Sequence, residues 1–88
     1  MAYQTNSLIT RIVWCRQQRT QARGHRESEE WHAEEDGLRD ALLNQDHSKH
    51  YRYSLPRIYS RYLTGLQDGR DLLRMDVVGI HFRSPGRQ

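Results

Sequence analysis

The sequence predicts a small, mainly α-helical protein: a helical bundle, or a helical hairpin plus a third helix, with a short C-terminal strand or extended segment. Apolar residues recur at helical spacing in three separate stretches, and residues that favour helix caps precede each stretch. β-branched and aromatic residues gather near the C-terminus. A chain of 88 residues is long enough for one domain. We therefore expect a single small helical domain over residues 1–83 and a disordered tail over residues 84–88.

The first predicted helix begins beside two polar residues that can cap its free N–H groups, Asn6 and Ser7. A four–three spacing places its apolar residues on one seam, formed by Leu8, Ile12 and Cys15. Between residues 16 and 30 the only apolar side chain is Ala22, which predicts a projecting helix or a mobile loop. Gly24 is the weakest point for helix continuity, so the first two segments form either one long helix or two.

The second predicted helix covers residues 28–44, with Ser28 as its N-cap. Its apolar stripe consists of Trp31, Leu38, Ala41 and Leu42. Glu35 and Arg39 stand four residues apart in the order that stabilises a helix. Gly37 interrupts the pattern, so a break is expected near it, and a connection follows the helix.

The third predicted helix carries the most complete apolar face. Six residues fall at helical positions i, i+3, i+4, i+7, i+8 and i+11, namely Leu55, Ile58, Tyr59, Tyr62, Leu63 and Leu66. Ser54 can cap this helix, and Pro56 would stand in its first turn, where a missing N–H costs little. Arg57 and Arg61 fall on the opposite face. We expect this helix to be central to the core.

The C-terminal region is expected to change structure after two glycines, Gly65 and Gly69, which leave the end of the third helix uncertain. Asp68 could cap a short fourth helix that carries Leu72, Leu73 and Met75. Residues 77–82 are rich in β-branched and aromatic side chains, which favour a strand. A lone strand is unstable, so it must pair with another segment, pair with a second copy of the chain, or lie extended across the helices.

Charged residues are arranged in blocks behind a net charge of only +3. Residues 1–26 hold five arginines and no acid, residues 27–46 hold eight acids and one arginine, and residues 47–67 hold four basic residues and no acid. Two interpretations are open. The blocks either complement one another across packed helices, or they leave a basic face free for an acidic partner.

The composition excludes several classes of protein. Cys15 is the only cysteine, so no intramolecular disulfide can form, and a disulfide-linked secreted scaffold is excluded. The longest apolar run, residues 12–15, is far too short for a signal-peptide core or a membrane span. We therefore expect a cytoplasmic protein that makes no contact with a membrane.

The best candidate surface combines arginine with tyrosine. Residues 47–62 hold four of the five tyrosines and no acid, and thirteen of the fourteen basic residues in the chain are arginines. Such a composition serves protein-binding hot spots and single-stranded nucleic acids, because guanidinium groups suit carboxylates, phosphates and aromatic faces. Helical spacing assigns Tyr59 and Tyr62 to the core. The predicted partner-binding residues are Arg16, Arg19, Arg23, Arg26, Tyr51, Arg52, Tyr53, Arg57 and Arg61.

Metal binding and catalysis have weaker signals. His47 and His50 form an H-x-x-H pair, but a structural zinc site needs four ligands and commonly includes a C-x-x-C pair. We therefore predict no metal and no cofactor. Cys15 lies in an apolar run, which is typical of a buried, unreactive thiol. The chain has no phosphate-binding glycine loop and no nucleophile elbow, and we predict a protein that is not an enzyme.

One short pattern points to a different chemistry. Arg19 and His25 form an R-x5-H arrangement on a predicted helix, which resembles the short motif of the all-helical HEPN ribonucleases. The resemblance covers these two residues, and the usual polar residue after the arginine is Thr20 here. It implies that His25 would act as general base and that Arg19 would stabilise the charge of a phosphorane-like transition state. The chain is shorter than a typical HEPN domain.

The predicted function is non-enzymatic binding of a macromolecule, a protein in the first instance, through the Arg/Tyr-rich surface. Small arginine-rich chains of this kind suggest a phage or mobile-element accessory protein that inhibits a host machine. The first alternative is a nucleic-acid-binding protein that uses the same basic surface, and the second is a small HEPN-like ribonuclease. A homodimer would use Trp14 or residues 77–82 at its interface.

Overall fold

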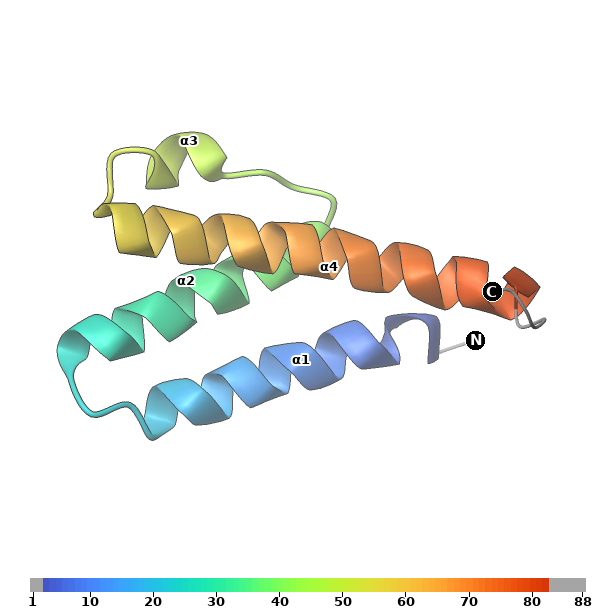
Figure 1. Cartoon of the computed structure of the whole chain (residues 1–88), viewed down its shortest axis with the longest axis horizontal. Helices are drawn as coiled ribbons and strands as arrows, with labels where there is room; N and C mark the ends of the chain where they lie inside the picture. The colour runs from blue at the N-terminus through green and yellow to red at the C-terminus, as the bar shows by residue number, and fades with distance from the viewer. Residues whose placement is uncertain (1–2, 83–88) are drawn as a thin grey trace.

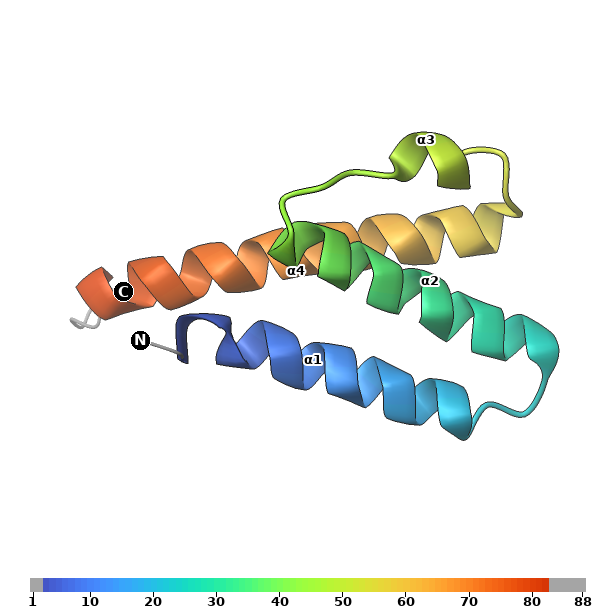
Figure 2. The same cartoon turned by 180° about the vertical axis from the view of Figure 1, so that it is seen from behind.

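A computed structural model describes residues 3–82, and the side chains of residues 7–75, as a bundle of helices (Figure 1). In chain order these are α1 (Tyr3–Thr20), α2 (His25–Leu42), α3 (Ser48–Tyr51) and α4 (Pro56–Phe82). α1, α2 and α4 pack against one another, and the one-turn α3 lies on the loop that returns the chain to the start of α4 (Figures 1 and 2). The predicted mainly α-helical fold is confirmed.

The first two segments are two helices, joined by a reversal at residues 21–24. Gly24 takes the N-cap position of α2, with an extended backbone and no side-chain cap. The prediction that helix continuity fails near Gly24 is therefore confirmed. The predicted caps are wrong, because α2 begins three residues before Ser28, and α1 begins at Tyr3, ahead of Asn6 and Ser7.

The apolar seam of α1 packs against α2 and α4. Leu8, Ile12 and Cys15 are buried in one cluster with Leu38, and the partly buried residues at its edge are Trp31, Leu42, Leu72 and Leu73. Burial of a leucine or isoleucine side chain contributes roughly 1.5–3 kcal/mol. The seam predicted from spacing is confirmed at its three apolar positions.

The contact between α2 and α4 is much closer, because small residues face each other along it. A Cβ atom added at Gly37 of α2 or at Gly65 of α4 would lie closer than 3.0 Å to backbone atoms of the opposite helix. At Gly69, an added Cβ would lie equally close to the side chain of Ala41. Glycine therefore permits this contact. The predicted break near Gly37, and the uncertain helix end at Gly65 and Gly69, are not observed, since both helices run through these positions.

The apolar face of α4 is narrower than its spacing suggests. Pro56 is the first residue of α4, as predicted, and Ile58, Tyr62 and Leu66 are buried. In contrast, Leu63 of α4 is 38% exposed, and Leu55, which precedes the first residue of α4, is 54% exposed. The helix start at Pro56 also places Ser54 one residue before the N-cap position, so its predicted capping role is not supported.

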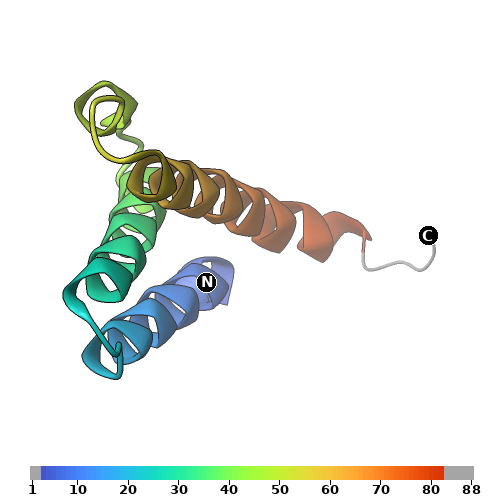
Figure 3. The same cartoon turned by 60° about the vertical axis from the view of Figure 1, so that its left-hand side comes forward.

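α4 continues as one helix through Phe82, and its last turns extend past α1 and α2 (Figures 1 and 3). The expected fourth helix after Asp68 is therefore part of α4. The strand or extended segment expected over residues 77–82 stays a prediction. The predicted tail at residues 84–88 lies outside the described residues.

The end of α2 is set by Asn44, whose φ of 56° lies in the left-handed region. The N–H of Asn44 donates to the carbonyl of Ala41, and the N–H of Gln45 donates to that of Asp40. This pattern is a Schellman motif, which satisfies the last carbonyls of a helix and turns the chain away. The loop that follows carries α3, a single helical turn within the connection predicted after the second helix.

Candidate interaction surface

The acidic block of the sequence lies largely inside the bundle. Glu34, Glu35 and Asp40 of α2 are each at most 7% exposed, because α1 and α4 both pack against α2. A buried carboxylate is stable only when charged or hydrogen-bonding groups surround it, and each of the three has such partners. This burial was not predicted, since only the apolar stripe of α2 was assigned to the core.

Glu34 joins the three long helices. Its Oε2 accepts a hydrogen bond from Arg11 Nη2 of α1 at 2.6 Å, and its Oε1 accepts one from Arg61 Nε of α4 at 2.9 Å. The thiol of Cys15 donates to Oε2 across 3.6 Å. Burial opposes the charge on Arg11, but hydrogen bonds to Glu34 and Asp68 outweigh it and raise the pKa of the guanidinium. Arg11 therefore remains a cation inside the bundle.

Glu35 forms ion pairs with two arginines near the end of α1 and with one arginine of α2. Arg16 Nε lies 3.1 Å and Arg39 Nε 3.2 Å from its Oε2, while Arg19 Nη1 lies 3.7 Å from its Oε1. Arg19 also contacts Nδ1 of His32. The predicted pair of Glu35 with Arg39 is confirmed. Most charged side chains of α1 and α2 therefore have a charged partner within the bundle, as expected if the charge blocks complement one another across packed helices.

Two aspartates of α2 hold the following loop. Oδ2 of Asp40 accepts a hydrogen bond from the Tyr62 hydroxyl at 2.5 Å and lies 2.8 Å from Nδ1 of His47. Asp36 accepts a hydrogen bond from the Tyr51 hydroxyl at 2.5 Å, and the rings of Tyr51 and Tyr62 stack with centroids 4.4 Å apart. Burial, followed by the neighbouring carboxylates, raises the pKa of both tyrosines, so both donate as neutral phenols at physiological pH.

The nine predicted partner-binding residues divide into two groups of four and one intermediate residue. Those engaged within the bundle are Arg16, Arg19, Tyr51 and Arg61. Those without a side-chain partner among the described residues are Arg23, Arg26, Arg52 and Tyr53. Arg57 is intermediate, because its side chain is 72% exposed and lies 3.5 Å from a carboxylate oxygen of Glu30.

Several of the available residues lie at the end of the bundle where α2 and α4 begin (Figure 1). Arg26, from the first turn of α2, helps to form a chiefly apolar hollow of about 260 Å³ there, whose lining is Arg26, Leu55, Pro56, Arg57 and Ile58. Tyr53 and Leu55, on the chain leading into α4, are 85% and 54% exposed. This end therefore presents apolar and aromatic surface beside available cations.

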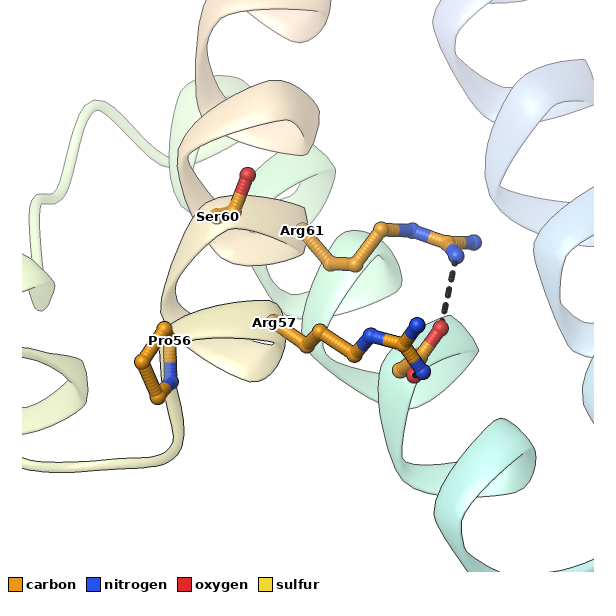
Figure 4. Close-up of a pocket in the computed structure, with 5 residues that line it drawn as sticks. Pro56, Arg57, Ser60 and Arg61 are labelled. Atoms are coloured by element: carbon orange, nitrogen blue, oxygen red, sulfur yellow. Dashed lines mark hydrogen bonds and ion pairs between the residues drawn. The ribbon is translucent and has the colours of Figure 1, made fainter.

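A shallower hollow of about 460 Å³ shares Pro56 and Arg57 with the first, and its remaining lining is Glu30, Ser60 and Arg61. Figure 4 shows the side chains of Arg57 and Arg61 extending in the same direction from α4, with the ion pair from Arg61 to Glu30 drawn as a dashed line. This pair measures 3.2 Å, whereas that of Arg57 measures 3.5 Å. Arg61 has further contacts with α2, so Arg57 is the arginine that can turn to a ligand.

A separate hollow of about 300 Å³ is lined by Asp36, Asp40, His47, His50 and Tyr51. The rings of His47 and His50 have centroids 5.7 Å apart. Among the residues that the structure describes, however, no three His, Cys, Asp or Glu side chains are placed to hold a metal ion. The hydrogen bonds in this hollow fasten α3 to α2 and α4.

The two residues of the HEPN-like pattern lie on different helices, with Arg19 near the end of α1 and His25 at the first residue of α2. The reversal at residues 21–24 separates them, so the expectation that they share one helix is wrong. Arg19 is held by Glu35, while Nε2 of the 87% exposed His25 lies 3.1 Å from Glu29. Each side chain thus has its own carboxylate partner.

Known proteins offer no family for comparison. The chain matches no protein-family model, and neither a curated protein sequence nor a solved structure is significantly similar to it. Within residues 3–82, none of the helices has the length and apolar character needed to cross a membrane.

Proposed function

We propose that this protein is a non-enzymatic protein-binding module that contacts its partner through the end of the bundle where α2 and α4 begin. This end surface consists of Arg26, Arg52, Tyr53, Leu55 and Arg57. The exposure of Tyr53 and Leu55, at 85% and 54% of their surfaces, is the observation that carries the proposal. Aromatic and arginine side chains are enriched where protein interfaces concentrate their binding energy.

The charge distribution favours a protein partner over a nucleic acid. Binding to a phosphate backbone depends on several available cations, each of which displaces counterions. Many arginines of α1 and α4 are instead paired with carboxylates of α2. A protein interface needs only a few complementary charges around an apolar contact.

An enzymatic role has no comparable support, because Arg19 and His25 are held by separate carboxylates. The narrower hypothesis of a phage or mobile-element protein that inhibits a host machine rests on size and composition, and it stays a prediction. A homodimer through Trp14 likewise stays a prediction, although Trp14 is 42% exposed on α1.

Site-specific photo-crosslinking tests the proposal. A benzophenone amino acid placed at position 53 should capture a discrete protein from a lysate of the source cells. The same group at Thr64, an exposed position further along α4, should not. The captured protein, once purified, should bind the double variant Tyr53→Ala/Leu55→Ala at least tenfold more weakly than the wild type.

A matched control for this affinity measurement is Ile9→Ala, which removes an apolar side chain that is 45% exposed on α1. Its affinity should equal that of the wild type. Equal crosslinking at positions 53 and 64, or an affinity that the double variant leaves unchanged, would refute the end surface.

Labelled DNA and RNA probes, titrated across a salt series, test the nucleic-acid alternative. We expect no submicromolar binding even at low salt. Tight binding that falls with salt at a log–log slope of several units would show phosphate neutralisation, and it would put nucleic acid in place of protein as the partner.

A further inference from the structure

The hollow at the start of α4 has apolar walls and a charged rim. Leu55, Pro56 and Ile58 supply the apolar part of its lining, and Arg26 and Arg57 supply the guanidinium groups. Its volume of about 260 Å³ lies below the roughly 300–1,000 Å³ of typical small-molecule sites. The hollow is therefore better suited to a single large side chain of a macromolecule than to a complete cofactor.

Both rim arginines can direct their charge toward a ligand. Arg26 has no ion-pair partner among the described residues. The pair of Arg57 with Glu30 is long, at 3.5 Å, and leaves the side chain 72% exposed. Arg61, one turn further along α4, is instead held by both Glu30 and Glu34. Guanidinium groups beside an apolar surface bind carboxylates well, because two parallel N–H donors match the two oxygens.

The acids near this rim already have partners within the protein. Glu27 accepts a hydrogen bond from a backbone N–H across 3.3 Å, Glu29 lies 3.1 Å from His25, and Glu30 is shared by two arginines of α4. Arg26 has no such partner. The lining of the hollow itself contains Arg26 and Arg57 and no acid, so it carries positive charge that a ligand can neutralise.

From this complementarity we infer that the hollow receives a short acidic and apolar segment of a partner protein. One large apolar side chain of the segment lies against Leu55 and Ile58, and carboxylates on either side of it bind Arg26 and Arg57. The inference rests on the proposed function and adds the chemistry of the partner. A basic segment, a nucleic acid and a second copy of this chain are the competing occupants.

Selection from a library of random short peptides tests this inference with the full chain. The wild-type protein should enrich peptides that carry one large apolar residue flanked by Asp or Glu. The charge-reversed variant Arg26→Glu/Arg57→Glu should instead enrich peptides flanked by Lys or Arg. A matched control, Arg70→Glu/Arg74→Glu, reverses two exposed arginines elsewhere on α4 and should enrich the same peptides as the wild type.

Fluorescence anisotropy with one enriched peptide then measures the effect, after circular dichroism has shown that each variant is helical. Arg26→Glu/Arg57→Glu and Leu55→Ala should each bind at least tenfold more weakly than the wild type. The affinity of the wild-type protein for the peptide should fall at least tenfold when the acids of the peptide are replaced by the corresponding amides.

The other outcomes separate the two proposals. Neutral or basic peptides whose binding is lost in Leu55→Ala would overturn the acidic partner and leave the proposed function standing. Peptides that bind independently of both Tyr53 and Leu55 would refute the end surface, and the inference with it. The inference would also be overturned if the wild-type protein enriched no peptide more strongly than the variant Arg26→Glu/Arg57→Glu does. A dimer in sedimentation that this variant abolishes, or displacement of the peptide by an oligonucleotide, would do so too.

Discussion

α2 packs against both α4 and α1, and the two contacts are built in different ways. Against α4, α2 places glycine and alanine, and the backbones approach so closely that an added methyl group has no room at Gly37 or Gly65. Against α1, the contact is made by larger apolar side chains, including Leu8, Ile12 and Cys15. A contact between backbones cannot relax around an added carbon, whereas a contact between side chains can partly close around a lost one.

Hydrogen bonds between charged side chains link the contact of α2 with α1 to its contact with α4. Glu34 accepts hydrogen bonds from Arg11 of α1 and from Arg61 of α4, so one carboxylate serves both sides of α2. Glu35 serves α1 through Arg16 and Arg19. We therefore expect the protein to lose most stability when a side chain is added to a glycine between α2 and α4. Truncation of an apolar side chain between α1 and α2 should cost less, and removal of a single hydrogen bond should cost least.

The largest effect is expected from Gly37→Ala. The new Cβ would lie closer than 3.0 Å to backbone atoms of Tyr62, Gly65 and Leu66, so α2 and α4 must separate. The loss in the free energy of unfolding should reach about 3 kcal/mol or more, measured by urea denaturation followed by circular dichroism. At Gly24 an added Cβ meets nothing within 4 Å, and Gly24→Ala should change stability by less than about 1 kcal/mol. Equal losses at the two glycines would contradict the close contact.

Truncation in the α1 seam should come next. Leu8 is fully buried, and Leu8→Ala removes its apolar contacts and leaves a cavity. We expect a loss of about 2–3 kcal/mol, measured in the same way. Its neighbour Ile9 is 45% exposed, so Ile9→Ala should cost less than about 1 kcal/mol. If both substitutions cost the same, α1 does not pack through the described seam.

Glu34→Gln removes one charge while keeping the size of the side chain. Because Arg11 and Arg61 remain 29% and 26% exposed, solvent compensates part of the loss, and we expect about 1–2 kcal/mol. The exposed Glu29 provides the control, since Glu29→Gln should cost less than about 0.5 kcal/mol. Double-mutant cycles with Arg11→Ala and with Arg61→Ala should both show coupling to Glu34. Coupling to one arginine only would show that Glu34 serves a single side of α2.

Tyr62→Phe removes the hydroxyl that donates to Asp40 and leaves this carboxylate with His47 as its partner. The expected loss is about 1 kcal/mol, together with faster hydrogen exchange in the loop that carries α3, because Tyr62 also accepts a hydrogen bond from the N–H of His47 at 2.6 Å. Tyr53→Phe, at an 85% exposed position, should change neither quantity. Unchanged exchange in Tyr62→Phe would show that the loop is held by other contacts.

The smallest effect concerns Cys15. Burial, and then the charge of Glu34, raises the pKa of its thiol to about 12. The thiol of an unfolded chain titrates near pH ~8.5, so this group contributes stability that is present below that pH and is lost as pH rises toward 12. Alkylation by iodoacetamide at pH 8 should therefore require opening of the protein. Labelling faster than global unfolding would show that α1 separates from α2 and α4 on its own, while labelling at the rate of a free thiol would contradict the burial.

The candidate surface was only partly predictable. Among the nine residues chosen from composition, Arg26, Arg52 and Tyr53 are available at the end surface, while Arg16, Arg19 and Arg61 are engaged by carboxylates of α2. Leu55 was assigned to the core by its spacing. The signal against that assignment was the proline that follows it, because a residue before proline is disfavoured in helical geometry and therefore tends to lie outside the regular face.

The sequence by itself determined the local features of this protein. The spacing of Leu8, Ile12 and Cys15 identified the buried seam of α1, Gly24 marked the end of helix continuity, and Pro56 marked the start of α4. Each of these depends on backbone propensity or on periodicity within a few residues. Such information is present in any short stretch of the chain.

Only the tertiary structure decided which charges are buried and which glycines are packed. Gly37 looked like a helix breaker, and nothing distinguished Glu34 from the other acids of residues 27–46, because a single helix carries no information about what covers its other face. Packing α2 against both α1 and α4 gave both residues their roles, since close backbone approach requires glycine and a buried carboxylate requires cations from its neighbours. The same packing left Leu55 and Arg57, at the start of α4, exposed to solvent.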